Sequence, residues 1–243
     1  MEQVNSFEGK SVFVTGANRG LGRALVDEAL RRDASRVYAA ARQPMVHPDP
    51  RVTPIILDVT NQTQIREVVQ TVTSLDILVN NAGVSLPDDL SDRAAFEVHL
   101  AVNLYGTLDV TRALLPALTR SRGAVINIVS ISALAAVPVL PAYSVSKAAS
   151  LSLTQSLRAL LAGRGIAVHA VMPGPIDTDM IRDLDIPKTP PADVARAALD
   201  GVERGEDEIF PDPFSQMLAD GWRIGVVKGL ERQNAAMVQA AAE

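Results

Sequence analysis

The sequence contains no cysteine among its 243 residues. This absence excludes disulfides, catalysis by a thiolate and cysteine-ligated zinc. It also agrees with a reducing compartment, and we expect a cytoplasmic protein. Only three histidines are present (His47, His99 and His169), and their separation does not match the spacing of metal ligands. We therefore expect no metal site.

Charge of one sign is not concentrated anywhere in the chain. The net charge is −5, and the 23 basic and 28 acidic residues are mixed, so we expect no nucleic-acid binding. The N-terminus lacks the basic segment and apolar core of a secretion signal. Residues 123–146 carry no charge and are long enough to span a bilayer. Their prolines, polar residues and β-branched start instead indicate a buried strand that runs into a loop, so we expect no membrane association.

Short apolar runs alternate with segments of helical periodicity. A strand followed by a helix, repeated this often, favours parallel pairing through right-handed crossovers. Near-continuous apolar strands are typical of a sheet with helices on both faces. We predict a single α/β domain over residues 1–243 with a doubly wound parallel sheet of about seven strands, a Rossmann-like fold. Strands are expected at 11–15, 36–41, 54–58, 75–80, 124–129, 166–171 and 208–210, and helices at 21–32, 61–72, 91–119, 144–162 and, more weakly, about 214–243.

A glycine-rich turn, T-G-A-N-R-G-L-G, occupies residues 15–22 between the first expected strand and the first expected helix. A dinucleotide pyrophosphate requires close approach of backbone N–H groups and the positive end of a helix. Glycines permit both the turn and the approach. The context favours a dinucleotide site over an ordinary tight connection. We predict cofactor contacts from Gly16, Asn18, Arg19, Gly20 and Leu21.

The end of the second expected strand indicates which nucleotide is bound. Enzymes that use NAD usually place a carboxylate there, to accept a hydrogen bond from the ribose 2′-hydroxyl. Here the strand is followed by Arg42 instead. Arg42 and Arg19 could bracket a 2′-phosphate, for which guanidinium groups are well suited. The alternative is that Arg42 is a solvated surface arginine. The sequence favours NADP(H) as cofactor.

Tyr143 and Lys147 are four residues apart in an expected helix, so their side chains share one face. A tyrosine with its ordinary pKa of about 10 is a poor acid–base catalyst at neutral pH. A nearby cation favours the phenolate and lowers that pKa. The pair alone is also compatible with two surface residues, so its meaning depends on the motifs around it.

The order of these motifs resembles the short-chain dehydrogenase/reductase family of the single-domain type, over about residues 10–212. The turn at 15–22 is followed by Asp58-Val59, Asn80-Asn81-Ala82-Gly83, Asn103, Ser130, Tyr143, Lys147 and the sequence P-G-P-I-D-T at 173–178. The resemblance implies an NADP(H)-dependent oxidoreductase, a carbonyl reductase or alcohol dehydrogenase. It would transfer hydride between the nicotinamide and a ketone, an aldehyde or a secondary alcohol.

The resemblance also implies roles for individual residues. Tyr143 would be the general acid/base, and Lys147 would bind the nicotinamide ribose and lower the pKa of the tyrosine. Ser130 would hydrogen-bond the substrate oxygen, with Ser132 as the alternative. Asn103 would hold a water that links Lys147 to solvent, or would simply kink its helix. Besides the turn, Tyr143 and Lys147, the cofactor contacts would be Arg42, Asp58, Val59, Asn81, Ala82, Gly83, Pro173, Gly174 and Thr178.

The segment at about 177–190 would be a substrate lid. It is short for the family, from which we expect an open site that tolerates varied or bulky carbonyl compounds. An apolar wall is expected at Leu134, Val137, Pro138 and Val139, although these residues could equally belong to the core.

The resemblance further implies a homo-oligomer, a dimer or a tetramer, formed through the helices at about 91–119 and 144–162. A catalytically silent NADP-sensing protein of the same fold is the alternative function. An epimerase or dehydratase of the longer related type fits less well, because only about 30 residues follow Phe210.

Overall fold

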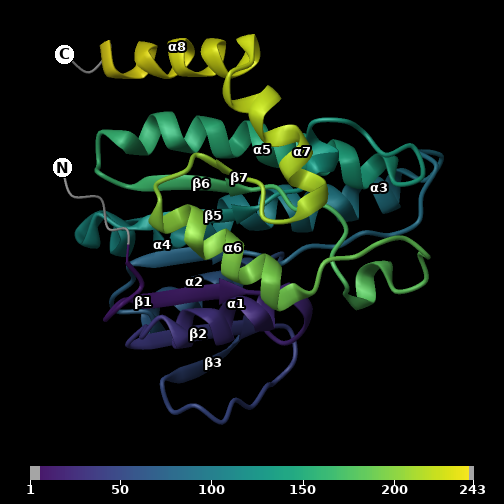
Figure 1. Cartoon of the computed structure of the whole chain (residues 1–243). Helices are drawn as coiled ribbons and strands as arrows, with labels where there is room; N and C mark the ends of the chain where they lie inside the picture. Colours follow the sequence, from purple (N-terminus) through teal and green to yellow (C-terminus); the bar gives the residue numbers. More distant parts are fainter. Residues whose placement is uncertain (1–5, 241–243) are drawn as a thin grey trace.

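One seven-stranded parallel sheet organises the computed structural model, which describes residues 6–240 (Figure 1). The strand order is β3-β2-β1-β4-β5-β6-β7, and every pairing between neighbours is parallel. This confirms the predicted fold class. The predicted domain limits within residues 1–5 and 241–243 lie outside the described residues. The strands are β1 Ser11–Thr15, β2 Arg36–Ala41, β3 Val52–Ile56, β4 Ile77–Asn80, β5 Ala124–Ile128, β6 Ala167–Val171 and β7 Glu208–Ile209.

Eight α-helices within residues 6–240 connect or follow these strands. The segment predicted as mostly helical at 91–119 is α3, a six-residue π-helical stretch and α4 in direct succession. A π-helical stretch inserts extra backbone into a helix and often marks a functional site. The helices are α1 Gly20–Arg31, α2 Gln62–Thr71, α3 Arg93–Leu100, α4 Thr107–Ser121, α5 Pro141–Ala162, α6 Pro191–Glu203, α7 Pro213–Arg223 and α8 Val226–Ala240, and the π-helical stretch is Ala101–Gly106.

Some boundaries differ from the predicted ones, and one helix was not predicted. The third strand lies two residues earlier than expected, because Asp58 accepts hydrogen bonds from the Thr60 amide and hydroxyl and turns the chain toward α2. Helix α5 begins at Pro141 rather than at residue 144, and proline suits the first position of a helix. Helix α6 was not predicted at all. Its signal was present, since Val194, Ala198 and Val202 recur at helical spacing and are buried.

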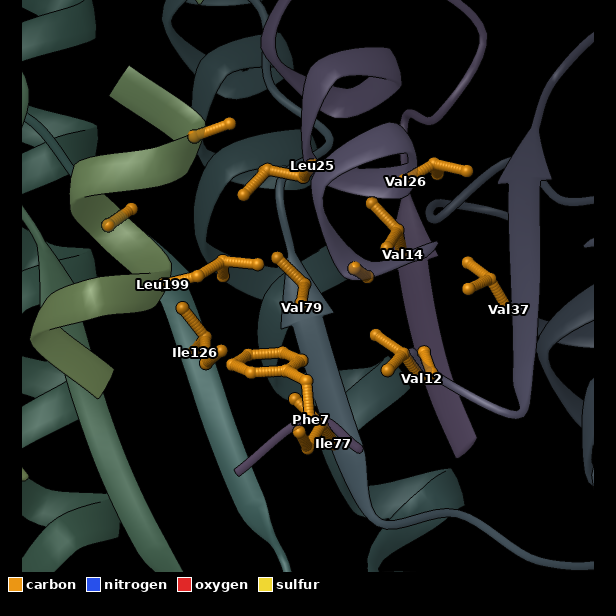
Figure 2. Packing of buried hydrophobic residues seen from close by; sticks show 14 of the residues in the cluster. Phe7, Val12, Val14, Leu25, Val26, Val37, Ile77, Val79, Ile126 and Leu199 are labelled. Carbon is orange, nitrogen blue, oxygen red and sulfur yellow. The ribbon is translucent and has the colours of Figure 1, made fainter. Parts of the chain in front are cut away.

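The sheet has a separate apolar core on each face, because successive side chains of a strand point to opposite sides. On one face, α1 and α6 pack against the sheet. Figure 2 shows Leu25 of α1 and Leu199 of α6 directed toward Val14 and Val79. On the other face, Phe13, one residue away from Val14, packs with residues of α2, α4 and α5. The two cores fix the sheet between two layers of helices.

The chain changes direction within the sheet between β1 and β4. From β1 the strands proceed to β2 and β3 on one side, whereas β4 to β7 proceed on the other side. At such a point the loops after adjacent strands diverge and leave a crevice at the carboxyl edge, where open α/β sheets bind ligands. The loops that carry the predicted cofactor residues follow β1 and β4, so the fold places them at this crevice.

The last two helices lie outside the two layers. Figure 1 shows α7 and α8 at the top of the molecule, with α8 beyond α5, and α5 and α8 are in contact. Helical structure was predicted for this region, and α7 begins at Pro213. Over residues 6–240, no helix is long and apolar enough to cross a membrane.

Candidate active site

The turn after β1 has the geometry of a phosphate cradle. Gly16 and Gly20 adopt φ angles of 65° and 54°, in the left-handed region that favours glycine. A Cβ on Gly22 would lie 2.1 Å from the Gly16 carbonyl oxygen, so only glycine fits there. The N-cap residue of α1 is Arg19, whose side chain makes no capping hydrogen bond, and the first turn of α1 has no acidic residue. Its uncapped N–H groups are therefore available to an anion.

Thr15 joins this turn to the loop after β4. Its hydroxyl oxygen accepts hydrogen bonds from the backbone amides of Asn81 and Ala82, both at 2.9 Å. In return, the Asn81 side-chain amide donates to the carbonyl oxygens of Thr15 at 2.9 Å and Gly16 at 3.2 Å. Thr15 is not among the predicted cofactor residues, although its place directly before the first glycine was a signal. The two cofactor loops thus form one hydrogen-bonded unit.

The arginines predicted to bracket a 2′-phosphate have different surroundings. Arg42 is exposed, and within residues 6–240 it makes no hydrogen bond or ion pair. Arg19 pairs with Asp179 of the 177–190 segment at 3.1 Å. The structure therefore leaves Arg42 available to an anion and engages Arg19 with the predicted lid. That both arginines would hold one phosphate stays a prediction.

Asp58 and Val59 lie at the start of the loop after β3. Burial raises the pKa of Asp58, but its hydrogen bonds from Thr60 and the charge of Arg42 outweigh this and hold that pKa below the usual value. The ends of β2 and β3, which carry Arg42 and Asp58, lie side by side, since the Leu57 amide donates to the Ala41 carbonyl oxygen at 2.9 Å. Val59 is buried against the π-helical stretch, where a Cβ on Gly106 would lie 2.7 Å from the Val59 side chain.

Lys147 is the buried cation of the site. It is 5% exposed, its ammonium donates to the Ile128 carbonyl oxygen at 2.8 Å, and it lies 5.7 Å from the centre of the Tyr143 ring. Within residues 6–240 no carboxylate pairs with it. Burial lowers the pKa of Lys147 to about 8, because desolvation disfavours the charged form. Gly83 is close by, since a Cβ there would lie 3.8 Å from the ammonium.

Tyr143 lies in the first turn of α5. Burial raises the pKa of its phenol above the ordinary value, and the Ser130 side chain acts in the opposite direction. The phenol is therefore neutral at physiological pH, which is the form that can donate a proton. The predicted lowering of this pKa by Lys147 stays a prediction.

Of the two candidate serines, Ser130 is the one whose side chain lowers the pKa of Tyr143. Ser130 follows β5, and its hydroxyl accepts from the Ser132 amide at 3.1 Å. The hydroxyl of Ser132 is itself buried without a partner within the described residues.

Asn103 lies in the π-helical stretch and is 1% exposed. Its side-chain oxygen accepts from the Val84 amide at 2.8 Å, and its side-chain nitrogen donates to the Val84 carbonyl oxygen and the Ser146 hydroxyl, both at 2.9 Å. The side chain thus connects the loop after β4 to α5. Asn103 lies in a distorted part of the helix, as one of its two predicted roles requires. The other role, holding a water that links Lys147 to solvent, stays a prediction.

The residues after β6 face the glycine-rich turn. The Thr178 methyl group lies 3.2 Å from the position that a Cβ on Gly20 would occupy. The Gly174 amide donates to Asp212 at the start of α7 at 2.7 Å, and the Pro173 carbonyl oxygen accepts from Ile131 at 3.1 Å. A β-bridge between Ile176 and Thr189 closes the ends of the 177–190 segment.

The predicted apolar wall divides into two parts. Val137 is 37% exposed and Val139 is 71% exposed, so they do not belong to the core. Leu134, in contrast, packs against the small core cluster of Val129 and Met172. Within residues 6–240, no group of three histidine, aspartate or glutamate side chains could hold a metal ion.

The chain belongs to the short chain dehydrogenase family. The model of that family matches residues 10–188. The predicted family is thereby confirmed, and the protein is an oxidoreductase of this family.

Relatives agree with this assignment. An uncharacterized oxidoreductase of Staphylococcus saprophyticus is 34% identical over 214 residues, covering 80% of this chain and 92% of that protein. A 3-amino-tetrahydro-pyrrolizinone reductase of Xenorhabdus hominickii is 37% identical over 179 residues, covering 70% of this chain and 62% of that enzyme. The crystal structure of a short chain dehydrogenase from Burkholderia cenocepacia in complex with NADP matches with a TM-score of 0.86 and 36% identity, covering 94% of this chain and 98% of that one.

Proposed function

We propose that the protein is an NADPH-dependent carbonyl reductase, which also catalyses the reverse oxidation of a secondary alcohol. The observation that carries the proposal is the burial of Lys147 beside Tyr143 without a carboxylate partner in the described chain. An unpaired buried charge is costly, and perturbed titratable groups in a crevice are typical of active sites.

The site residues would act on the proton and on the substrate oxygen. The neutral Tyr143 phenol would donate its proton to the carbonyl oxygen, and Ser130 would hold that oxygen by a hydrogen bond. Lys147 would restore the proton and stabilise the phenolate left behind. When bound, NADPH supplies the hydride that reduces the carbonyl carbon.

Three observations support NADP(H) rather than NAD(H). No carboxylate follows β2, where an NAD enzyme would bind the ribose 2′-hydroxyl. Arg42 stands there instead, exposed and unpaired within residues 6–240. The similar Burkholderia protein was crystallised in complex with NADP. The remaining predicted contacts, from Gly16 to Thr178, would line the same crevice.

The substrate would be an apolar, bulky carbonyl compound. Exposed apolar side chains occur on both predicted borders of the substrate site: Val137 and Val139 before α5, and Met180, Leu184 and Ile186 on the 177–190 segment. Large apolar side chains at the mouth of a site favour an apolar ligand. One similar enzyme is named as a reductase of a bicyclic pyrrolizinone, which is compatible with such a substrate.

We further propose a cytoplasmic homo-oligomer. The absence of cysteine agrees with a reducing compartment. Apolar side chains are exposed on the helices predicted to form the interface, among them Tyr105 beside α4 and Val145 and Leu160 of α5.

The proposal is tested with a panel of aldehydes and ketones of increasing size, assayed with NADPH and NADH in parallel. We expect turnover with NADPH, preference for bulky apolar ketones, and a loss of about a thousand-fold in kcat for Tyr143→Phe with unchanged NADPH binding. Tyr105→Phe is the matched control and should keep wild-type rates, since it retains the ring and removes a hydroxyl for which no hydrogen bond occurs within the described residues. Tyr143→Phe with wild-type turnover would contradict the mechanism, and a preference for NADH would contradict the role of Arg42.

A further inference from the structure

The loop after β4 is tied down at every second residue between 84 and 88. Val84 exchanges two hydrogen bonds with the Asn103 side chain. The Leu86 amide donates to Nε2 of His99 at 3.0 Å. Asp88 accepts at Oδ1 from the Ala142 amide at 3.1 Å. We refer to residues 84–88 as the strap, because it runs from the cofactor loop after β4 to the start of α5.

The middle anchor of the strap is a fully buried histidine. His99 is 0% exposed, and its Nδ1 lies 2.8 Å from the Ala95 carbonyl oxygen of the preceding helical turn. Nδ1 must therefore carry the proton and donate to Ala95, which leaves Nε2 as the acceptor for Leu86. With Asn103 and His99 both rigidly held, the strap delivers Asp88 to a defined position.

Helix α5 cannot cap its own N-terminus. Its N-cap residue is Leu140, which has no side-chain acceptor, and its first residue is Pro141, which has no N–H. The next amide, that of Ala142, is satisfied by Asp88 from 54 residues earlier in the chain. The other carboxylate oxygen of Asp88 is buried and has no partner within the described residues. A carboxylate at this place is favoured because the start of a helix is electropositive.

A second contact holds the same helical turn from the other side. The Ser144 hydroxyl donates to the Leu140 carbonyl oxygen at 3.0 Å and accepts from the Val137 amide at 3.0 Å. Residues 137–140 are therefore held to α5 by Ser144 of the same helix, and Asp88 holds the first turn of α5 to the strap. Between Ala142 and Ser144 lies Tyr143.

We propose that Asp88 is a positioning residue, which holds the first turn of α5 so that the Tyr143 phenol stays in register with Ser130. The proposal rests on the carbonyl reductase function proposed above. First-turn amides have no intrahelical acceptor, so this part of a helix frays most readily. Without Asp88, the turn would loosen and Tyr143 would sample positions from which proton donation fails. Lys147, one turn further along, would keep its place.

Asp88→Ala tests the proposal, with Asp92→Ala as matched control. Asp92 is in the same stretch of chain and caps α3 through the Ala94 amide at 2.8 Å, a helix without the predicted catalytic pair. We expect Asp88→Ala to lower kcat at least ten-fold with the KM for NADPH changed less than two-fold. Asp92→Ala should retain kcat within two-fold. Asp88→Asn, which keeps an oxygen acceptor, should restore kcat to within three-fold of wild type.

An equal loss of kcat in Asp88→Ala and Asp92→Ala would overturn the proposal, because Asp88 would then be an ordinary cap. If Asp88→Ala does not fold, Asp88→Glu tests the proposal instead, since it keeps the charge but displaces the carboxylate oxygen from the Ala142 amide. A loss of kcat of three-fold or more in that variant supports the proposal, and a wild-type rate overturns it.

A readout without turnover separates this proposal from the proposed function. The chain has three tyrosines, so ring-labelled tyrosine gives three NMR signals, and Tyr143→Phe assigns one of them. We expect the Tyr143 signal to move or broaden in Asp88→Ala and to stay in place in Asp92→Ala. This result would support the positioning role even if no carbonyl compound were reduced. An unmoved Tyr143 signal in Asp88→Ala would overturn it.

Discussion

Two lysines are buried in the described part of the chain, and their surroundings differ completely. Lys147, in the site, is 5% exposed, and its ammonium donates to a carbonyl oxygen, with no carboxylate partner in that part of the chain. Lys228, on α8, is 2% exposed and lies between Glu208 at 2.7 Å, Glu231 at 2.7 Å and Asp207 at 3.3 Å.

The charges around Lys228 form a compact network that attaches α8 to the body. Arg158 of α5 contacts Glu208 at 2.8 Å and Glu231 at 2.5 Å, so two cations share the same carboxylates. Helix α8 thus buries charged side chains, while its Val226 and Val227 are 91% and 64% exposed. Helix α1, in contrast, buries mainly its leucines and valine, together with one carboxylate, Glu28.

The difference teaches how to distinguish a functional from a structural buried charge. A buried ammonium costs free energy unless anions compensate it. Around Lys228 that compensation is complete, so the lysine contributes to the docking of α8. Around Lys147 it is absent, and the pKa falls to about 8. We attribute the retention of this uncompensated charge to the proposed catalytic role of Lys147, since the charge itself costs stability.

The largest effects are expected from replacing each lysine by methionine, which has a similar shape. These variants should separate the proposed catalytic role of Lys147 from the structural role of Lys228. We expect Lys147→Met to lower kcat about a thousand-fold and to leave the free energy of unfolding unchanged or higher. Lys228→Met should keep kcat within about three-fold and lower the free energy of unfolding by about 3 kcal/mol, because Glu208 then stays buried with one cation fewer. Steady-state kinetics and urea titration measure both quantities. Similar stability losses in the two variants would contradict the distinction.

Two helical glycines extend the comparison to the backbone. A Cβ on Gly22 of α1 would lie 2.1 Å from the Gly16 carbonyl oxygen, whereas nothing lies within 4 Å of the corresponding position on Gly229 of α8. We expect Gly22→Ala to cost about 3 kcal/mol or more of stability and to abolish NADPH binding. Gly229→Ala should be neutral or should stabilise by up to about 1 kcal/mol, through its better helix propensity. Thermal unfolding and fluorescence titration with NADPH compare the two variants. Wild-type stability and NADPH binding in Gly22→Ala would contradict the close approach of Gly22 to the Gly16 carbonyl oxygen.

A smaller effect that distinguishes the two lysines is expected in the pH dependence of the reaction rate and of the stability. Lys147 loses its proton as the pH rises through about 8, so the rate of carbonyl reduction should fall about ten-fold per pH unit above that value. Because the pKa of Lys147 is lower in the folded than in the unfolded protein, the contribution of this group to stability increases from about pH 8 toward about pH 10.5. Lys147→Met should abolish this stability increase. The Lys228→Met variant should retain the wild-type pH–rate profile, and a shifted profile would link the two lysines.

Much of the site could be predicted from the order of motifs along the chain. The turn at 15–22, the loop at 80–83 and the pair Tyr143 and Lys147 all lie at the carboxyl edge of the sheet, as the strand-turn-helix pattern required. Helix α6 was missed although its periodicity was present, because the preceding segment was read as a lid without a following element.

Other features have no local signal in the sequence. The tie of Asp88 to Ala142 and the network of Arg158, Glu208 and Lys228 join residues that are tens of positions apart. Hydrophobic periodicity also does not place α8, because its apolar Val226 and Val227 are exposed while its Lys228 is buried.

The sequence by itself indicated the parallel sheet, the glycine-rich turn and, through the family resemblance, the predicted catalytic residues, because strand hydrophobicity, glycine spacing and the order of motifs can all be read along the chain. Only the tertiary structure decided which charges are compensated. Lys147 and Lys228 are the same residue type, and both lie on helices. Burial without an anion lowers the pKa of Lys147. Three carboxylates surround Lys228, from Asp207, Glu208 and Glu231. Both surroundings are made by residues that only the folded chain brings together.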